Sequence, residues 1–199
     1  MDSYYITIGR QYGSGGKEIG ERLASFLGIP FYDKELLKVA SAGSGLDEEI
    51  FNQHDEKPAS SFFYAFSSGA SSAGVTGLPI NHKVFLAQFD AIRDIAQKGS
   101  CVIIGRCADY ALEDFENVIN IFIYADMEFK KQRALSYGVP ENKLEDAIIK
   151  TDKKRAGYYN FYSGKKWGEK GSYDLLINSG KLGIEKTAAL LAEYVNLRF

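Results

Sequence analysis

The sequence predicts an α/β fold in which helices cover both faces of a parallel β-sheet. A β-branched and aromatic run at 4–8 leads into a glycine-rich loop and then a helical pattern. A continuous apolar run at 101–104 is typical of a strand buried on both faces. Strands alternate with helices along the chain, which favours right-handed crossovers between parallel strands. The predicted strands are 4–8, 29–32, 101–104, 118–125 and 173–177.

The loop after the first strand carries the clearest functional signal. A strand, a glycine loop and a helix together aim backbone N–H groups and a helix N-terminus at a phosphate. In a P-loop, a glycine stands five residues before the Gly-Lys pair and Ser or Thr follows it; here Gln11 and Glu18 take those places. We predict nucleotide phosphate binding, with a glycine-rich turn carrying a surface lysine as the alternative. The predicted phosphate-binding residues are Gly13, Ser14, Gly15, Gly16, Lys17 and Glu18.

Two charged residues follow predicted strands at the edge where open α/β sheets bind ligands. Asp33 ends the second strand, and either caps the next helix or faces a ligand. Arg106 comes directly after the apolar strand 101–104. A guanidinium placed there can hold a phosphate through two hydrogen bonds. We favour that ligand role over a surface salt bridge.

Residues 41–80 carry the weakest pattern. Residues 46–55 fit a short acidic helix, and 66–77 are almost entirely Ser, Gly and Ala. A segment of that composition and length inside a compact domain is typical of a lid, a binding loop or disorder. The aromatic residues within 62–66 are expected to pack against the domain, a ligand base or a second subunit.

Helices are also predicted in the second half of the chain. The apolar spacing of 81–98 indicates an amphipathic helix that Asn81 can cap. Asp126 is expected to cap the helix after the fourth strand, and 141–161 fits a long charged helix. The segment 157–168 combines aromatic residues, glycines and cations; composition alone leaves a wet surface patch open as its role.

Composition narrows the functional classes. The chain has 199 residues, 45 % of them hydrophobic, which suits one folded domain over 1–199. The formal charge of −2 and the lack of a Lys/Arg block give no reason to expect a nucleic-acid partner. No apolar run approaches the ~20 residues of a membrane span. The two cysteines and two histidines do not form a metal-ligand pattern, so we expect a cytoplasmic protein with reduced thiols.

The order and spacing of several motifs, taken together, resemble the cytidylate kinase-like proteins of bacteria, a divergent branch of the P-loop nucleoside-monophosphate kinases. The resemblance covers essentially the whole chain. It implies a three-layer α/β/α fold, a five-stranded parallel sheet of order 2-3-1-4-5, and the use of ATP and Mg²⁺. The motifs are 6–17, 30–33, Gly105-Arg106, Asp152-x-x-Arg155, Tyr158-Tyr159, 163–168 and 173–178.

The resemblance also implies roles for individual residues. Lys17 and the glycine loop would hold the β- and γ-phosphates of ATP. Arg106 would bind the phosphate of the acceptor, and Asp33 would face its sugar or base. Arg155, oriented by Asp152, would stabilise charge on the transferring phosphoryl group. These kinases carry an arginine before the lid at the position of Arg133, which is a further catalytic candidate. Residues of about 41–80 would form a mobile acceptor-binding insertion, and about 150–170 the lid.

The chain departs from true cytidylate kinases at two points. Glu18 replaces a glycine or hydroxyl residue of the loop, and Ile148-Ile149 replace an Arg-Asp pair of the lid. Three hypotheses follow. The leading one is an ATP-dependent kinase of a nucleoside monophosphate, with cytidylate named because of the family. The others are a nucleotide-binding sensor with weak or no transfer, and a small-molecule kinase with a non-nucleotide acceptor. A homodimer stays open.

Overall fold

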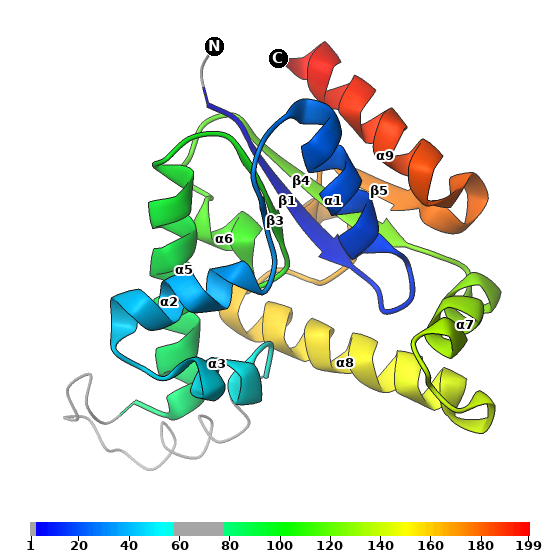
Figure 1. The fold of residues 1–199 in the computed structure, drawn as a ribbon, viewed down its shortest axis with the longest axis horizontal. Helices are drawn as coiled ribbons and strands as arrows, with labels where there is room; N and C mark the ends of the chain where they lie inside the picture. The colour runs from blue at the N-terminus through cyan, green and yellow to red at the C-terminus, as the bar shows by residue number, and fades with distance from the viewer. Residues whose placement is uncertain (1–2, 58–77) are drawn as a thin grey trace.

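A computed structural model describes residues 3–57 and 78–199. Its centre is a five-stranded, fully parallel sheet of order β2-β3-β1-β4-β5, with helices on both sides (Figure 1). The predicted fold class and strand order are thus confirmed. The strands are β1 (Tyr5–Arg10), β2 (Phe31–Tyr32), β3 (Cys101–Ile104), β4 (Val118–Tyr124) and β5 (Leu175–Asn178).

Helices alternate with these strands, as the apolar spacing predicts. Two short 3₁₀ turns lie at Glu141–Lys143 and Lys170–Ser172. The helices are α1 (Gly16–Leu27), α2 (Glu35–Ser44), α3 (Glu48–His54), α5 (Ile80–Ala96), α6 (Ala108–Ala111), α7 (Met127–Ser136), α8 (Leu144–Ser163) and α9 (Ser179–Arg198).

Two hydrophobic cores form because successive strand residues point to opposite faces of the sheet. Ile6 and Ile8 of β1 are fully buried on the face covered by α1 and α9. Tyr5 of β1 and Ile103 of β3 belong to the core on the other face, under α2, α5 and α6. The central strands are therefore apolar on both sides, which explains their unbroken hydrophobic runs.

A third core contains aromatic residues from the end of α8. Tyr158, Tyr159 and Tyr162 are buried there. The ring of Tyr162 stacks on Phe85 of α5 with 3.9 Å between centroids. These three rings of the segment 157–168 therefore pack inside the protein. For them, the structure excludes the wet surface patch that composition left open. The packing fixes α8 across the carboxyl end of β1 (Figure 1).

The structure shifts several predicted boundaries. β5 begins at Leu175, because Tyr173 joins the third core. The helix predicted at 81–98 runs from Ile80 to Ala96, and Pro79 precedes it in place of the predicted cap Asn81. Asp126 does precede α7, but its carboxylate accepts a hydrogen bond from Asn178 and pairs with Lys181 instead of capping the helix.

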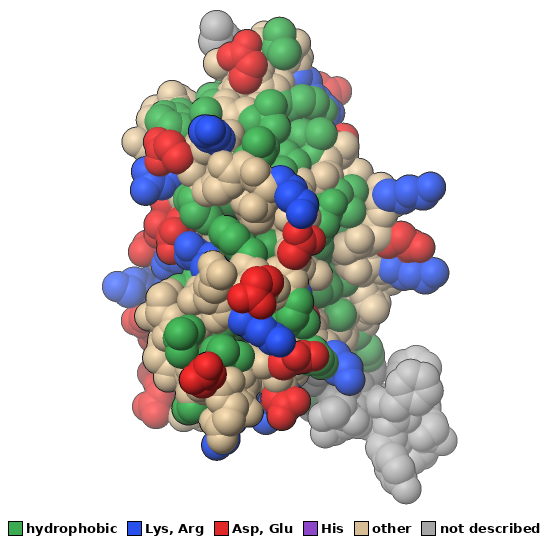
Figure 2. Space-filling model, turned by 90° about the vertical axis from the view of Figure 1, so that its right-hand side faces the viewer, with side chains coloured by type: hydrophobic (Ala, Val, Ile, Leu, Met, Phe, Trp, Pro, Cys, Tyr) green, Lys and Arg blue, Asp and Glu red, His purple; other side chains and the backbone are tan. Residues whose placement is uncertain are grey.

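The predicted insertion at about 41–80 is described in part. α2 and α3 pack against α5, and Phe51 of α3 is fully buried in the core beneath them. The aromatic residues at 62–66 and the Ser/Gly/Ala stretch at 66–77 lie outside the described residues. In the part that the structure describes, no helix is long and apolar enough to cross a membrane. Figure 2 shows one face of the molecule, on which charged side chains of both signs are interspersed.

The core under α1 makes a stability prediction. Leu23 is fully buried between α1 and the sheet, so Leu23→Ala should lower the free energy of unfolding by about 2–5 kcal/mol. Leu190 on α9 is 50 % exposed, and Leu190→Ala should change it by less than about 0.5 kcal/mol. Urea denaturation of both variants measures the difference. Equal losses would contradict the assigned packing.

Candidate functional site

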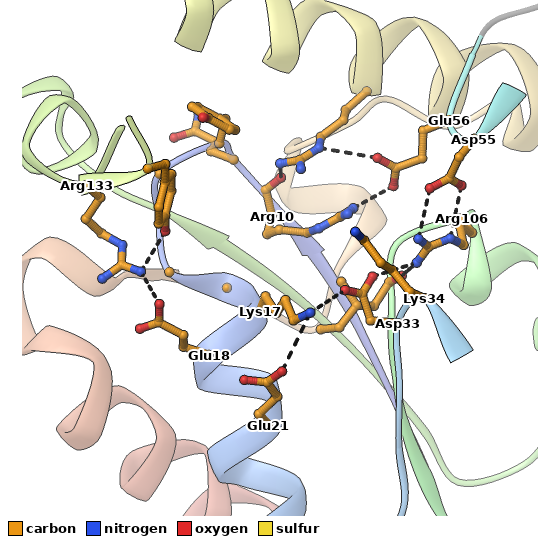
Figure 3. Close-up of a pocket in the computed structure, with 18 residues that line it drawn as sticks. Arg10, Lys17, Glu18, Glu21, Asp33, Lys34, Asp55, Glu56, Arg106 and Arg133 are labelled. Carbon is orange, nitrogen blue, oxygen red and sulfur yellow. Dashed lines mark hydrogen bonds and ion pairs between the residues drawn. The ribbon is translucent and has the colours of Figure 1, made fainter. Parts of the chain in front are cut away.

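A cavity of about 540 Å³ opens where the glycine loop, the ends of β1 and β3 and helix α8 meet (Figure 3). Its walls carry charges of both signs: six cationic and five acidic side chains. The cations are Arg10, Lys17, Lys34, Arg106, Arg133 and Arg155. The acids are Glu18, Glu21, Asp33, Asp55 and Glu56.

The glycine loop is shaped in advance to receive an anion. Gly13 and Gly15 both have φ +75°, a conformation that side chains disfavour. A Cβ on Gly13 would lie 2.7 Å from the carbonyl oxygen of Lys130. Ser14 is fully buried, and its carbonyl accepts a 2.6 Å hydrogen bond from the hydroxyl of Ser179. The loop therefore leads into α1, whose first N–H groups lack helical partners, with its backbone held in place.

Lys17 stands at the start of α1 and reaches across the cavity. Its Nζ lies 3.0 Å from Asp33 Oδ2 and 3.7 Å from Glu21 Oε1. The hydrogen bond to Asp33 raises the pKa of Lys17. The side chain is still 52 % exposed, so its charge faces the cavity and not the core.

Glu18 lines the cavity and is paired with an arginine. Its Oε1 accepts a 2.6 Å hydrogen bond from Arg133 Nη2. Arg133 comes from α7, and its guanidinium lies 5.5 Å from the ring centroid of Tyr137. The negative charge that replaces the usual hydroxyl residue is thus compensated by a neighbouring arginine.

Asp33 is not a helix cap. α2 begins at Glu35 after Lys34, and the Asp33 side chain turns into the cavity. Its Oδ1 accepts a 2.9 Å hydrogen bond from Arg106 Nη1. Burial alone would raise the pKa of Asp33, but Arg106 and Lys17 hold it below its ordinary value. Of the two roles considered from the sequence, the cap is therefore wrong, and the role facing a ligand stays a prediction.

Arg106 lies in the interior, which excludes a surface salt bridge. Its side chain is 3 % exposed, and its backbone adopts φ +55°. Gly105 and Cys107 on either side are also left-handed, with φ +67° and +54°. Such backbone is costly for residues other than glycine and is common at functional sites. The turn directs the guanidinium back along β3, where Nη1 also donates to the carbonyl of Ile104 at 2.9 Å.

Three residues that the sequence analysis did not assign complete the cluster. Asp55 accepts hydrogen bonds on both oxygens from Arg106, at 3.1 Å from Nε and 3.0 Å from Nη2. Glu56 Oε1 lies 2.7 Å from Arg10 Nη1, and Glu56 Oε2 lies 3.4 Å from Arg155 Nε. Arg10 ends β1 as Arg106 follows β3, so the same strand-end argument would have found it. No local pattern points to Asp55 or Glu56.

Helix α8 connects the cluster to the glycine loop. Asp152 Oδ1 accepts a 2.6 Å hydrogen bond from the N–H of Tyr12, and Oδ2 pairs with Lys130 at 3.3 Å. Arg155 Nη1 donates to the carbonyl of Arg10 at 3.1 Å. Burial and the neighbouring Arg10 lower the pKa of Arg155 to about 10, although Glu56 and Asp152 oppose this shift. All the predicted site residues are thus gathered within one cavity or, for Asp152 and Ser14, directly behind its wall.

Comparison with known proteins agrees with this geometry. The sequence model of the cytidylate kinase-like family matches residues 5–181. The chain belongs to that family. A crystal structure of an uncharacterized protein from Eubacterium ventriosum is 32 % identical, with a TM-score of 0.72 over 97 % of this chain and 98 % of that one.

More distant structures share the fold of this cytidylate kinase-like protein. Shikimate kinase from Bacteroides thetaiotaomicron is 16 % identical, with a TM-score of 0.55 over 97 % of this chain and 98 % of the other. Shikimate kinase from Acinetobacter baumannii in complex with shikimate is 13 % identical, with a TM-score of 0.52 over 100 % and 95 %. No curated protein matches the sequence. Family and fold together support a phosphotransferase.

The buried Glu56 predicts a pH effect on stability. Arg10, Arg155 and Arg106 hold its pKa far below the ordinary 4.5, although burial alone would raise it. A depressed carboxyl pKa stabilises the fold fully above pH 4.5, and this contribution is lost as the pH falls further. Glu56→Gln should lower the free energy of unfolding at pH 7 by about 3–5 kcal/mol and flatten its loss below pH 4.5.

Chemical denaturation between pH 3 and 8 measures this effect. Glu185→Gln is the control, because Glu185 forms an ion pair with Arg22 in which the two side chains are 61 % and 51 % exposed. Such surface pairs contribute about 0–1 kcal/mol. The stabilising role assigned to Glu56 is wrong if both variants lose stability below pH 4.5 as steeply as the parent protein does.

Proposed function

We propose that the protein transfers the γ-phosphoryl group of ATP to a small-molecule acceptor bound beside Asp33 and Arg106. The observation that carries this proposal is the shared cavity: Lys17 of the phosphate loop lies 3.0 Å from Asp33, which in turn binds Arg106. Phosphoryl transfer needs the donor and the acceptor side by side. In-line transfer depends on how the two are positioned more than on a nucleophile of the protein.

The glycine loop supports the ATP half of the proposal. Its left-handed residues Gly13 and Gly15 lead into the start of α1, and a loop of this kind before a helix N-terminus commonly presents backbone N–H groups to a phosphate. Lys17 would place its ammonium on the terminal phosphates by leaving Asp33. Because Glu18 is paired with Arg133, it does not oppose the triphosphate with a free charge.

The fold family implies Mg²⁺ with the nucleotide, and the residues present fit it. Mg²⁺ commonly binds one or two carboxylates together with phosphate oxygens and waters. Asp33 and Glu21 both line the cavity on either side of the Lys17 ammonium, and they are the side chains that would hold the ion. When bound, it would neutralise charge on the phosphates. Within residues 3–57 and 78–199, no cluster of three or more His, Cys, Asp or Glu forms a metal site by itself.

The transfer itself would use the two sides of the cavity. An oxygen of the acceptor bonds to the γ-phosphorus, and the bond from that phosphorus to the bridging oxygen of ADP breaks. Where the acceptor atom is a hydroxyl oxygen, its proton leaves to solvent, because Arg106 and Lys17 hold the pKa of Asp33 low and leave it a weak base. Arg155 would stabilise the charge spread over the transferring group. Its position at the carbonyl of Arg10, in the wall between loop and acceptor side, supports that role. Asp152 would hold the loop in register from behind through Tyr12.

The acceptor has two candidates. A nucleoside monophosphate, with cytidylate named by the family resemblance, would use Arg106 for its phosphate. A non-nucleotide acceptor gains support because Asp55 already engages that edge of Arg106.

Titration calorimetry with Mg·ATP, followed by an ADP-release assay across acceptors, tests the proposal. ATP binding without stimulated release by any acceptor would favour the sensor hypothesis. The cytoplasmic location and the homodimer stay predictions.

Lys17→Ala should weaken Mg·ATP binding by about tenfold to a hundredfold, because a hydrogen bond to a charged group contributes about 1.5–3 kcal/mol. Calorimetry measures the dissociation constant. Lys166→Ala is the matched control, since the Lys166 side chain is 76 % exposed, pairs with Glu169 on the surface and does not line the cavity. Unchanged affinity in Lys17→Ala would show that the loop does not hold phosphate as proposed.

Arg155→Ala should lower kcat by about a hundredfold or more while changing ATP affinity much less. The physical reason is that its interaction strengthens as charge develops in the transition state. Steady-state kinetics and calorimetry on the same protein separate the two effects, and Arg155→Lys tests whether a single charge recovers part of kcat. Equal losses in binding and in kcat would make Arg155 a ligand clamp instead.

A further inference from the structure

Three arginines converge where the acceptor would bind. Arg10 ends β1, Arg106 follows β3, and Arg155 comes from α8; all three line the cavity. Guanidinium groups bind phosphate through paired hydrogen bonds and keep their charge when buried. A site built from three of them is, by its composition, suited to a phosphate group.

Two consecutive carboxylates already occupy this position. Asp55 holds the Nε and Nη2 edge of Arg106 at 3.1 and 3.0 Å, which is the edge that a phosphate would use. Glu56 lies 2.7 Å from Arg10 (Figure 3). Its other carboxylate oxygen lies 3.4 Å from Arg155. Together the two side chains carry two negative charges, close to the charge of a phosphate monoester at neutral pH.

The placement of the two carboxylates is built into the surrounding structure. Glu56 is 9 % exposed and adopts φ +50°, a left-handed conformation that its side chain disfavours. Lys154 Nζ donates to the carbonyl of Asp55 at 3.0 Å, and Gln88 donates to Asp55 Oδ1 at 3.2 Å. At Gly105, any Cβ would overlap the contact between an arginine and Glu56.

The charges at the acceptor side are therefore largely satisfied by the protein itself. Arg106 is shared by Asp55 and Asp33, whereas Arg10 and Arg155 share the single carboxylate of Glu56. The first group therefore carries one negative charge in excess, which Lys17 contacts through Asp33, and the second group carries one positive charge in excess. A second phosphate, on the acceptor, would have to displace paired carboxylates or lie against them.

We propose that Asp55 and Glu56 take the place of an acceptor phosphate, so that the acceptor is a hydroxyl compound without a phosphate group of its own. The inference rests on the proposed phosphotransfer and deepens it. Asp33 and Asp55, which both line the cavity, then accept hydrogen bonds from hydroxyl or amino groups of that compound. The two residues act as determinants of specificity, since they exclude a phosphorylated acceptor through charge repulsion.

The test measures anion binding with the ATP site filled. Each protein is saturated with the non-hydrolysable ATP analogue AMP-PNP and Mg²⁺, and calorimetry then measures binding of inorganic phosphate and of CMP. The parent protein should bind neither better than millimolar. Asp55→Asn and Glu56→Gln each remove one negative charge, and each should tighten phosphate binding by about tenfold or more. Asp114→Asn is the control, because Asp114 is 83 % exposed and remote from the cavity.

Two results would overturn the proposal. One is micromolar binding of CMP to the parent protein, or ADP release stimulated by CMP, with both carboxylates in place. The other is folded Asp55→Asn and Glu56→Gln variants that bind phosphate no tighter than Asp114→Asn. The measurement on the parent protein decides even where a variant does not fold. Failure of the ATP proposal is seen separately, as absent AMP-PNP binding before any phosphate is added.

Discussion

The buried guanidinium of Arg106 is the constraint on which the site depends. A charge with a 3 % exposed side chain is tolerated only when partners and hydrogen bonds replace its water. Asp33 supplies one partner from the end of β2, and Asp55 supplies the other from the segment after α3. The edge of the sheet and the helical insertion are thereby tied together through one side chain.

Helix α8 joins this cluster to the phosphate loop. Asp152 of this helix accepts a hydrogen bond from the N–H of Tyr12, and Arg155 donates one to the carbonyl of Arg10. The backbone on either side of the start of the loop is therefore bound to the same helix. The helix is itself anchored by buried tyrosines that stack on α5. The position of α8 therefore sets the geometry of both the loop and the acceptor side.

The charged residue that departs from the usual P-loop pattern takes part in an ion pair at the cavity. Glu18, which by itself would repel a triphosphate, is bound to Arg133 and so shapes the wall of the cavity. Ile148 and Ile149 stand where the family resemblance implies an Arg-Asp pair, but Arg10 lies in contact with the same carboxylate as Arg155. Cationic charge is kept in the cavity by residues from different elements, and carboxylates from the insertion balance it.

The sequence by itself determined the sheet, the glycine loop and the strand-end positions of Asp33 and Arg106. These follow from local rules: hydrophobic periodicity, glycine conformation and the common edge at which parallel strands end. Only the tertiary structure decided which charges meet. Glu56 lies 46 positions from Arg10, and Asp55 lies 51 from Arg106. Ion pairs between residues so far apart produce no periodic pattern in the sequence. They depend on how the insertion packs against the sheet and not on neighbours in the chain.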